Sequence, residues 1–361
     1  MATTPGGIGN VTANQALLEM AMAYSRSRVV CTAARLGVAD ALAERECSVD
    51  DLAQVCRADR SSLYRLLRAL ASLGVATETG SGRFALTPFG EPLRKDAPNS
   101  VWPGVVLWAD LIEDSWSYLT ECVRTGQTAM QVMESQGITP RWSKDPDANA
   151  IFRAVMGTAP SEDYLPIVRA WDFSGSRVVA DLGGGGGALL SAVMKSYPNL
   201  KGMLVDRQQS TEAAAPRFQA EGLAARCQFI AADLHESVPS GADVYLMKHV
   251  LHGCQNEVAI KILKNCRAVM HSDAVLLVVE FVLPDVVSHA VPKLEGLFMS
   301  DLNMMTVTGG KERSASEWKS VLGAAQLRMG RVVPVAAQDR SRPNAPVVEG
   351  VSIIEATLEP C

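Results

Sequence analysis

Two histidines and a glutamate stand in the chain where their side chains could move a proton. His249 and His252 lie one helical turn apart in the stretch LMKHVLHGCQNE. Imidazole is the side chain best suited to accept a proton near neutral pH. Glu280 follows the apolar run of LLVVEFVLPD, and a carboxylate in a buried strand is costly unless it has a partner. A protonated imidazole would be such a partner, so the pattern predicts general-base chemistry.

The same residues do not indicate a metal centre. No further histidine or cysteine stands at a suitable spacing to complete a site around the two histidines, although distant carboxylates could contribute. The eight cysteines are scattered without CxxC pairs, which argues against both a zinc site and a disulfide framework. We therefore expect no metal.

Five consecutive glycines in VVADLGGGGGALL, residues 178–190, predict a ligand-binding turn. Glycine inside a regular element costs about 0.5–1 kcal/mol relative to alanine, so five of them need a reason. Between a strand and a helix, missing side chains let the backbone approach a ligand, and the amides at the helix start point toward it. Gly183, Gly185 and Ala188 also satisfy the loose G-x-G-x-x-G/A pattern of dinucleotide-binding turns, which is weak evidence alone.

Three aspartates limit the class of ligand that the glycine turn could bind. Asp206 ends the run MLVD, about 20 residues beyond the glycines, where a carboxylate can accept both ribose hydroxyls. Asp233 follows the next apolar run, in FIAADL, and Asp181 directly precedes the glycines. Asp181 could fix the turn or meet a cationic end of the ligand. Three acids at successive strand ends of one sheet predict a site for a nucleoside-containing ligand.

The secondary structure that the sequence predicts around these residues differs from that of the preceding part of the chain. From residue 177 short apolar runs alternate with helical stretches, which favours a parallel sheet covered by helices on both faces. The last two runs, LRMGRVVPVAA and PVVEGVSIIEATL, are separated by a polar loop and indicate a terminal antiparallel pair. We expect an α/β fold with a Rossmann-like, doubly wound sheet.

The first third of the chain is predicted to be helical. Apolar residues recur at helical spacing over residues 13–44 and 60–75, Ser48 can cap the helix between them, and VATETGSGRFALTPFG indicates a hairpin. This is the outline of a winged helix. Residues 101–170 are again helical and hold four of the six tryptophans, which pack in a core or form a wall for a flat substrate.

On these motifs the sequence resembles the class I S-adenosylmethionine-dependent methyltransferases. DLGGGGG is similar to the DVGGGTG motif of the small-molecule O-methyltransferases of the plant caffeic-acid and hydroxyindole type, which include bacterial enzymes of secondary metabolism. The resemblance covers nearly the whole chain. It implies a winged-helix-like dimerisation domain over residues 1–105, a helical connector over 106–170 and a catalytic domain over 171–361. It also implies S-adenosylmethionine as cofactor and a homodimer.

The resemblance assigns roles to individual residues. The stretch around the histidines is similar to the family's KHVLHDWxDE, which makes His252 the general base and places Lys248 beside the cofactor. His249 is interpreted, apart from the resemblance, as a packed or locally bonded imidazole. Glu280 matches the family's xxExVLP, and Glu312, in TGGKERSASEW, matches GGKERT. Both would orient the base. The remaining implied contacts are to the cofactor from Asp181, Gly183, Gly185, Asp206, Asp233 and Leu234, and to the substrate from Trp108, Phe152, Met156, Asn303 and Met304.

One departure from the family pattern concerns the residues after the base. Gly253 and Cys254 replace an aspartate and a tryptophan, so the predicted base remains while the details of substrate binding change. The departure could mark an unusual acceptor or related chemistry.

We therefore predict an O-methyltransferase acting on a phenolic or enolic hydroxyl of a small aromatic or polyketide-like metabolite. C- or N-methylation by the same machinery is an alternative, because a general base serves all three. A nicotinamide-dependent oxidoreductase would share the sheet and the glycine turn but has less use for the histidine and its glutamates.

The composition and charge of the chain argue against several other functions. The chain of 361 residues has a net charge of −5, whereas a nucleic-acid binder is usually basic. A DNA-binding regulator is suggested only by the winged helix, with Arg60, Arg65 and Arg68 on one helix. The start, MATTPGGIGN, shows no signal peptide, and no apolar stretch approaches the roughly 20 residues of a membrane span. We expect a cytoplasmic protein that binds neither nucleic acid nor membrane.

Overall fold

The structure is a computed structural model that describes residues 12–156, 160–287, 294–336 and 350–359. The chain forms two compact units. We call them the N-terminal unit, Met1–Ser117 with Gly137–Val155, and the C-terminal unit, Tyr118–Gln136 with Met156–Cys361. The domain boundaries given by the resemblance stay predictions. Residues 1–10, where the sequence predicts no signal peptide, lie outside the described residues.

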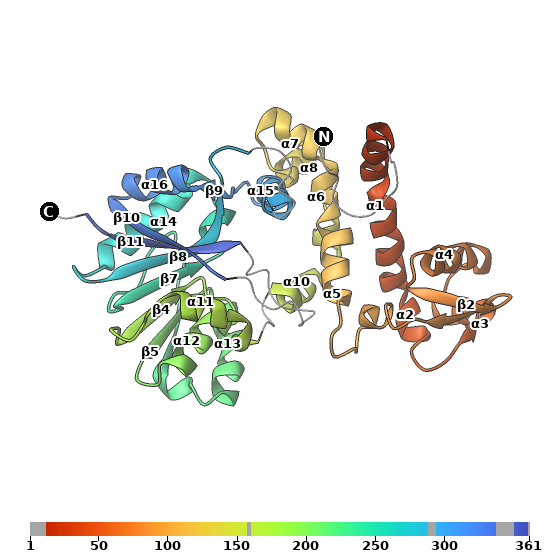
Figure 1. Ribbon diagram of the computed structural model, residues 1–361, viewed down its shortest axis with the longest axis horizontal. Coiled ribbons are helices and arrows are strands. Elements are labelled where there is room, and N and C mark those ends of the chain that lie inside the picture. The colour runs from red at the N-terminus through yellow and green to blue at the C-terminus, as the bar shows by residue number, and fades with distance from the viewer. Residues whose placement is uncertain (1–11, 157–159, 288–293, 337–349, 360–361) are drawn as a thin grey trace. The chain divides into compact units, whose positions relative to one another are not determined.

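The N-terminal unit consists of helices and one small sheet (Figure 1). Its helices are α1 (Ala13–Leu36), α2 (Val38–Ala41), α3 (Val49–Val55), α4 (Arg60–Ser72), α5 (Trp102–Val106), α6 (Glu113–Ser117), α9 (Arg141–Lys144) and α10 (Ala148–Met156), with the 3₁₀ turn η1 (Glu91–Leu93) and the π-helical turn η2 (Leu107–Leu111). Its strands are β1 (Cys47–Ser48), β2 (Ala76–Gly80) and β3 (Arg83–Leu86), in the order β1-β3-β2.

Local sequence explains where these helices begin and end. Gly37 ends α1 in the left-handed conformation, at φ 68°, which a residue with a Cβ rarely adopts. The Ser48 hydroxyl accepts a hydrogen bond from the amide of Asp51 at 3.1 Å, so the predicted cap of α3 is present. Asp59 caps α4 in the same way through the amide of Ser62. The helices and hairpin follow the outline that the sequence predicts, with β1 as an additional short strand.

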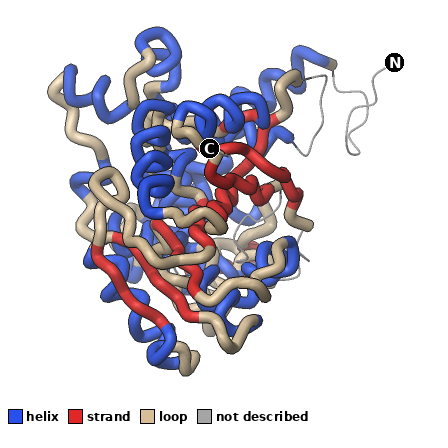
Figure 2. The backbone as a smooth tube through the Cα atoms, turned by 90° about the vertical axis from the view of Figure 1, so that its left-hand side faces the viewer, coloured by secondary structure: helices blue, strands red, loops and turns tan. Residues whose placement is uncertain are grey.

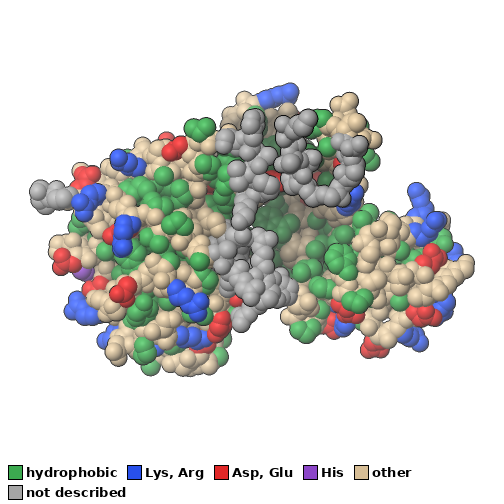
Figure 3. All heavy atoms as spheres, viewed as in Figure 1, with side chains coloured by type: hydrophobic (Ala, Val, Ile, Leu, Met, Phe, Trp, Pro, Cys, Tyr) green, Lys and Arg blue, Asp and Glu red, His purple; other side chains and the backbone are tan. Residues whose placement is uncertain are grey.

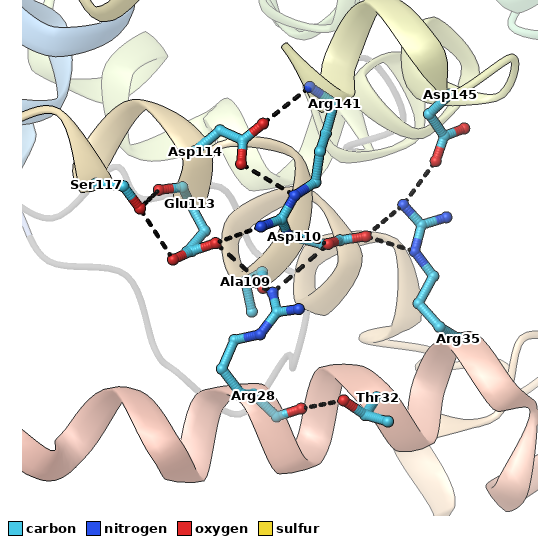
Figure 4. Close-up of polar contacts among 10 residues, drawn as sticks. All are labelled: Arg28, Thr32, Arg35, Ala109, Asp110, Glu113, Asp114, Ser117, Arg141 and Asp145. Carbon is cyan, nitrogen blue, oxygen red and sulfur yellow. Dashed lines mark hydrogen bonds and ion pairs between the residues drawn. The ribbon is translucent and has the colours of Figure 1, made fainter. Parts of the chain in front are cut away.

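A network of charged side chains joins the long helix α1 to later helices of the same unit (Figure 4). At its centre Asp110, on η2, accepts hydrogen bonds from Arg35 of α1 at 2.7 Å and from Arg141 of α9 at 2.8 Å. Arg28, also on α1, lies 3.5 Å from the same carboxylate. Burial alone would raise the pKa of Asp110, but the two bonded guanidinium groups outweigh it and hold the pKa below its usual value. The network fixes the π-helical turn that carries Trp108.

The C-terminal unit is built around a sheet of eight strands. The strands are β4 (Val178–Leu182), β5 (Lys201–Asp206), β6 (Cys227–Ala231), β7 (Val244–Lys248), β8 (Val275–Leu283), β9 (Arg313–Ser314), β10 (Leu327–Pro334) and β11 (Val351–Leu358). The helices are α7 (Leu119–Thr125), α8 (Ala129–Ser135), α11 (Leu165–Ala170), α12 (Ala188–Ser196), α13 (Gln208–Ala220), α14 (Asn256–Val269), α15 (Glu295–Val307) and α16 (Ala315–Ala324), with 3₁₀ turns η3 (Ser161–Tyr164), η4 (Ala224–Arg226) and η5 (Leu251–Gly253).

The strand order β10-β11-β8-β7-β4-β5-β6 confirms the predicted doubly wound sheet, and β9 pairs with β8 beside it. Figure 2 shows the strands in red and the helices in blue. The five strands from β8 to β6 are parallel, whereas β11 is antiparallel to both β8 and β10. This is the expected terminal antiparallel pair. The polar loop predicted between β10 and β11 falls largely on residues 337–349, outside the described residues.

Alternate residues of the strands enter two separate cores. On β4, Val179 packs with α12 and α13 on one face of the sheet, whereas Ala180 and Leu182 pack with α14 and α16 on the other. This period of two, with both faces covered, explains why the strand sequences are almost continuously apolar. Because the strands are parallel, β4, β5 and β7 end at the same edge of the sheet. None of the helices in the described ranges has both the length and the apolar character that a membrane span requires.

Candidate active site

The glycine run forms the turn between β4 and α12. The amide of Gly183 donates to the carbonyl of Val205 at 2.7 Å, and the amide of Gly185 donates to the carboxylate of Asp206 at 2.9 Å. The turn is therefore tied to the end of the neighbouring strand β5. Gly187, the N-cap residue just before α12, is in the left-handed conformation, and a Cβ there would overlap the ring of Phe218. Both packing and backbone conformation thus require glycine in this turn.

Asp181 lies beneath this turn and is 2% exposed. Its Oδ2 has no hydrogen-bond partner among the described residues, and a Cβ on Gly184 would come within 2.7 Å of it. Burial raises the pKa of Asp181 to about 7, although the charge of Lys248 opposes the shift. An unpartnered buried carboxylate and a close cation fit a polar ligand end at this edge of the sheet. That Asp181 contacts the cofactor stays a prediction.

The other predicted cofactor residues lie around the same turn. Asp206 is the last residue of β5, and Leu234 would lie 3.8 Å from a Cβ on Gly183. Asp233 is exposed and accepts a hydrogen bond from the amide of His235 at 2.9 Å. The fold thus brings the turn, Asp206 and Leu234 together, as a nucleoside site requires.

Glu280, fully buried on β8, holds the backbone of the loop that contains His252. Its Oε1 accepts hydrogen bonds from the amides of Val250, Leu251 and His252 at 3.0, 3.0 and 3.3 Å. The imidazole, which the sequence indicates as the partner of Glu280, is farther away, with Nδ1 at 3.7 Å from Oε2. Glu280 therefore supports both the loop and the ring.

Glu312 is the nearer carboxylate to the predicted base. Its Oε1 lies 2.9 Å from Nδ1 of His252 and also accepts a hydrogen bond from the Ser300 hydroxyl at 2.8 Å. An ionised carboxylate only accepts, so Nδ1 carries the proton and Nε2 carries the lone pair. Burial disfavours a charged His252, but the two glutamates outweigh burial and raise the pKa of the imidazole. Without the family pattern Glu312 would be interpreted as a solvated loop charge, yet it is 1% exposed.

Arg313 completes the support of this loop, and the sequence did not indicate it. It is fully buried and donates to the carbonyls of Leu251 at 2.9 Å and Cys254 at 2.7 Å. A buried anion, Glu280, thus binds amides of the loop, while a buried cation binds its carbonyls. Burial lowers the pKa of Arg313. The sequence signal for Arg313 is its position next to Glu312. A charged residue buried beside the site needs partners for its charge, as Glu280 does.

Gly310 is the second residue that sequence reasoning missed. The amide of Lys311 donates to the carbonyl of His252 at 2.8 Å, which seats the GGKER segment directly on the base loop. A Cβ on Gly310 would overlap that carbonyl oxygen and lie 2.5 Å from the carbonyl carbon of Gly253. The close approach of two backbones leaves no space for a side chain there.

The predicted substrate residues are divided between the two units. Trp108 and Phe152 belong to the N-terminal unit, where both are exposed and Phe152 packs edge-on against Trp142 at 5.7 Å. Asn303 and Met304 are on α15 in the C-terminal unit, with Asn303 buried. Met156, at the end of α10, is exposed. A shared substrate pocket stays a prediction.

Among the described residues, one group of histidine, cysteine, aspartate and glutamate side chains is close enough to hold a metal ion. It consists of His252, Glu280 and Glu312, whose ligand atoms lie within 4.8 Å of one another. The hydrogen bonds above already account for this arrangement. The expectation that no metal is needed stays a prediction.

Comparisons with known proteins match both parts of the chain. The family model described as the O-methyltransferase domain matches residues 116–328, and that of the O-methyltransferase dimerisation domain matches residues 18–96. A phenazine O-methyltransferase of Lysobacter antibioticus is 32% identical over 96% of this chain and 97% of its own length. An O-demethylpuromycin O-methyltransferase of Streptomyces alboniger is 34% identical over 89% of this chain and 85% of its own. The solved structure of a mitomycin 7-O-methyltransferase superposes with a TM-score of 0.83 at 31% identity, covering 96% of this chain and 98% of that one.

Proposed function

Because this chain belongs to the O-methyltransferase family, of which a solved member binds S-adenosylmethionine, we propose that it methylates a phenolic or enolic hydroxyl of a small aromatic or polyketide-like secondary metabolite. The observation that carries the proposal is the hydrogen bond of 2.9 Å between Nδ1 of His252 and Glu312. It leaves Nε2 as the basic nitrogen, on a loop that buried charges hold in place. The relatives named above methylate hydroxyl groups of secondary metabolites, which supports this substrate class.

In this mechanism His252 is the general base. S-adenosylmethionine supplies a methyl group that its sulfonium makes electrophilic. Nε2 of His252 takes the proton of the acceptor hydroxyl, which increases the nucleophilicity of the oxygen. Glu312 and Glu280 stabilise the imidazolium that results, since both are buried and lie 2.9 and 3.7 Å from Nδ1. General-base action contributes about 10²–10⁴-fold in rate, and positioning contributes several kcal/mol more.

The cofactor would bind at the carboxyl edge of the sheet. The glycine turn with Gly183 and Gly185 offers backbone approach, and Asp206 offers a carboxylate to a ribose. Asp233 and Leu234 would border the adenine. Lys248 would lie beside the cofactor, and its burial lowers the pKa of the ammonium group.

We also infer a homodimer. Five large apolar side chains of α1, each between 63% and 72% exposed, are uncovered in the single chain: Leu17, Leu18, Met20, Met22 and Tyr24. They lie within or next to the segment that matches the dimerisation domain. Apolar surface of this extent on one helix is typical of an interface.

Two alternative functions are methylation of nitrogen or carbon and binding of DNA. Methylation of nitrogen or carbon could use the same base. A DNA-binding role has little support, because Arg60 of α4 is paired with Asp50 at 2.5 Å. On the face shown in Figure 3, basic and acidic side chains of the N-terminal unit are interspersed. Thermal shift with S-adenosylmethionine against nicotinamide cofactors, and salt-dependent DNA binding, separate these classes.

The function is tested by incubating the full-length protein with methyl-labelled S-adenosylmethionine and a panel of phenols, enols and aromatic amines. We expect label on the oxygen of at least one phenol or enol, located by mass spectrometry and NMR. Transfer to nitrogen or carbon only, with phenols and enols unmodified across the panel, would contradict O-methylation.

For the cofactor site, we expect Asp206→Ala to weaken S-adenosylmethionine binding by about 1–3 kcal/mol, the size of a lost pair of charge-assisted hydrogen bonds. Asp206→Asn retains an acceptor for the amide of Gly185 and should lose less. Asp273→Ala, an exposed aspartate on a distant turn, is the control. Unchanged affinity of Asp206→Ala in calorimetry would rule the assignment out.

A further inference from the structure

We propose that His249 is a positioning residue, whose neutral ring stacks on the imidazole of His252 and holds that base in its working orientation. The inference rests on the proposed function, in which His252 takes the proton. The sequence indicates a packed or locally bonded imidazole at His249, and the motifs compared above give its ring no part in the reaction.

The backbone at His249 adopts a conformation that costs energy. Its φ is +53°, in the left-handed region that residues with a Cβ rarely occupy. Its amide donates to the carbonyl of Val279 at 3.2 Å, so strand β8 holds the backbone there. Strain of this kind persists where surrounding contacts compensate for it, and it gathers at functional sites. The contacts of the His249 ring therefore indicate its role.

The ring of His249 lies against two other rings. It is stacked on His252, with centroids 5.1 Å apart and planes 19° from parallel. It is also tilted against Phe281, at 5.3 Å between centroids. His252 is thus held in two independent directions, in its plane by the bond from Nδ1 to Glu312 and on one face by His249. Together these contacts restrict the rotation that would move Nε2 away from an acceptor.

Electrostatics keep His249 from competing for the proton. Its Nδ1 lies 3.2 Å from Nζ of Lys248, and an ammonium group can only donate, so the ring proton is on Nε2. Burial, then the charge of Lys248, then that of His252 hold the pKa of His249 well below its usual value. The charged groups around the stacked pair are Lys248 on β7, Glu280 on β8 and Glu312 next to β9. A neutral ring on the face of His252 covers that face without opposing its protonation, whereas a second charged ring would repel the imidazolium.

The test replaces His249 with asparagine and with phenylalanine in the full-length protein. Asparagine tolerates a positive φ and offers Lys248 an acceptor, but it removes the stacked ring. We expect its kcat to fall by about 10-fold or more, because small misplacements of a catalytic group are costly, with S-adenosylmethionine affinity unchanged in calorimetry. Phenylalanine keeps a ring and loses the bond to Lys248, so it should retain more of kcat than asparagine.

The pH–rate profile gives a readout that loss of folding would not change. The pKa of His252 is raised by the two glutamates, and burial opposes that rise. Opening one face of the ring to water weakens the opposing effect of burial, so the acidic limb of the His249→Asn profile should move to higher pH. Unchanged kcat and an unchanged limb would overturn the proposal, as would equal losses in the two variants. If the wild-type enzyme itself has no acidic limb, the base role of His252 fails instead, which is a separate result.

Discussion

Replacing His252 with alanine is expected to lower kcat by about 10²–10⁴-fold and to leave the affinity for S-adenosylmethionine nearly intact. The loss is confined to kcat because Nε2 acts on the acceptor proton, while the predicted cofactor contacts come from other residues, at the ends of β4, β5 and β7 and just after β6. The loss should be smaller for acceptors whose hydroxyl is already acidic, because less of the barrier then depends on proton removal.

The pH dependence identifies the group. The buried glutamates raise the pKa of His252 above its usual value, and only the deprotonated ring can accept a proton. Wild-type kcat should therefore fall as the pH drops through this raised pKa, and the His252→Ala profile should lack that limb. His271→Ala, which removes a half-exposed imidazole elsewhere in the same unit, should keep both kcat and the limb. A profile of His252→Ala that retains the wild-type limb would mean that another group is the base.

Much of the frame around this base could be predicted from local sequence. Alternation of apolar runs with helical stretches predicted the parallel sheet, because strands covered on both faces are apolar throughout. The cap at Ser48 depends only on residues three positions apart. The position of Asp206 next to the glycine turn followed from a rule of parallel sheets, in which ligands lie at the carboxyl ends of strands.

The support of the base loop could not be predicted in the same way, because it depends on contacts between segments that are 28 to 62 positions apart in the sequence. The sequence predicts an imidazole as the partner of the Glu280 carboxylate, yet three backbone amides lie closer to that carboxylate than the imidazole does. The one sequence signal for a buried Arg313 is its position next to Glu312, and its partners at Leu251 and Cys254 are carbonyls, which every residue possesses. A backbone amide or carbonyl is present in every residue, so the sequence does not show which of them a charged side chain will bind. The sequence can therefore show that burying Glu280 or Arg313 is costly, but not which groups compensate for the cost.

Gly310→Ala is expected to lower kcat by about 10² or more, although the residue carries no side chain and performs no chemistry. A Cβ there would overlap the carbonyl oxygen of His252 and come within 2.7 Å of the amide nitrogen of Cys254. Both neighbours are backbone atoms and cannot rotate away. Either the base loop or the segment that carries Glu312 must move, and a shift of about 1 Å in a catalytic group can cost 10²-fold.

The matched control is Gly253→Ala, on the opposing loop. A Cβ on Gly253 would meet no atom within 4 Å, and its φ lies outside the left-handed region, so this variant should keep most of its activity. The two substitutions add the same methyl group to facing segments and differ only in the space available. In Gly310→Ala the acidic limb should also move to lower pH, because separation from Glu312 removes an interaction that raises the pKa of His252. Equal kcat values for the two variants would show that the close backbone approach at Gly310 does not hold the base in place.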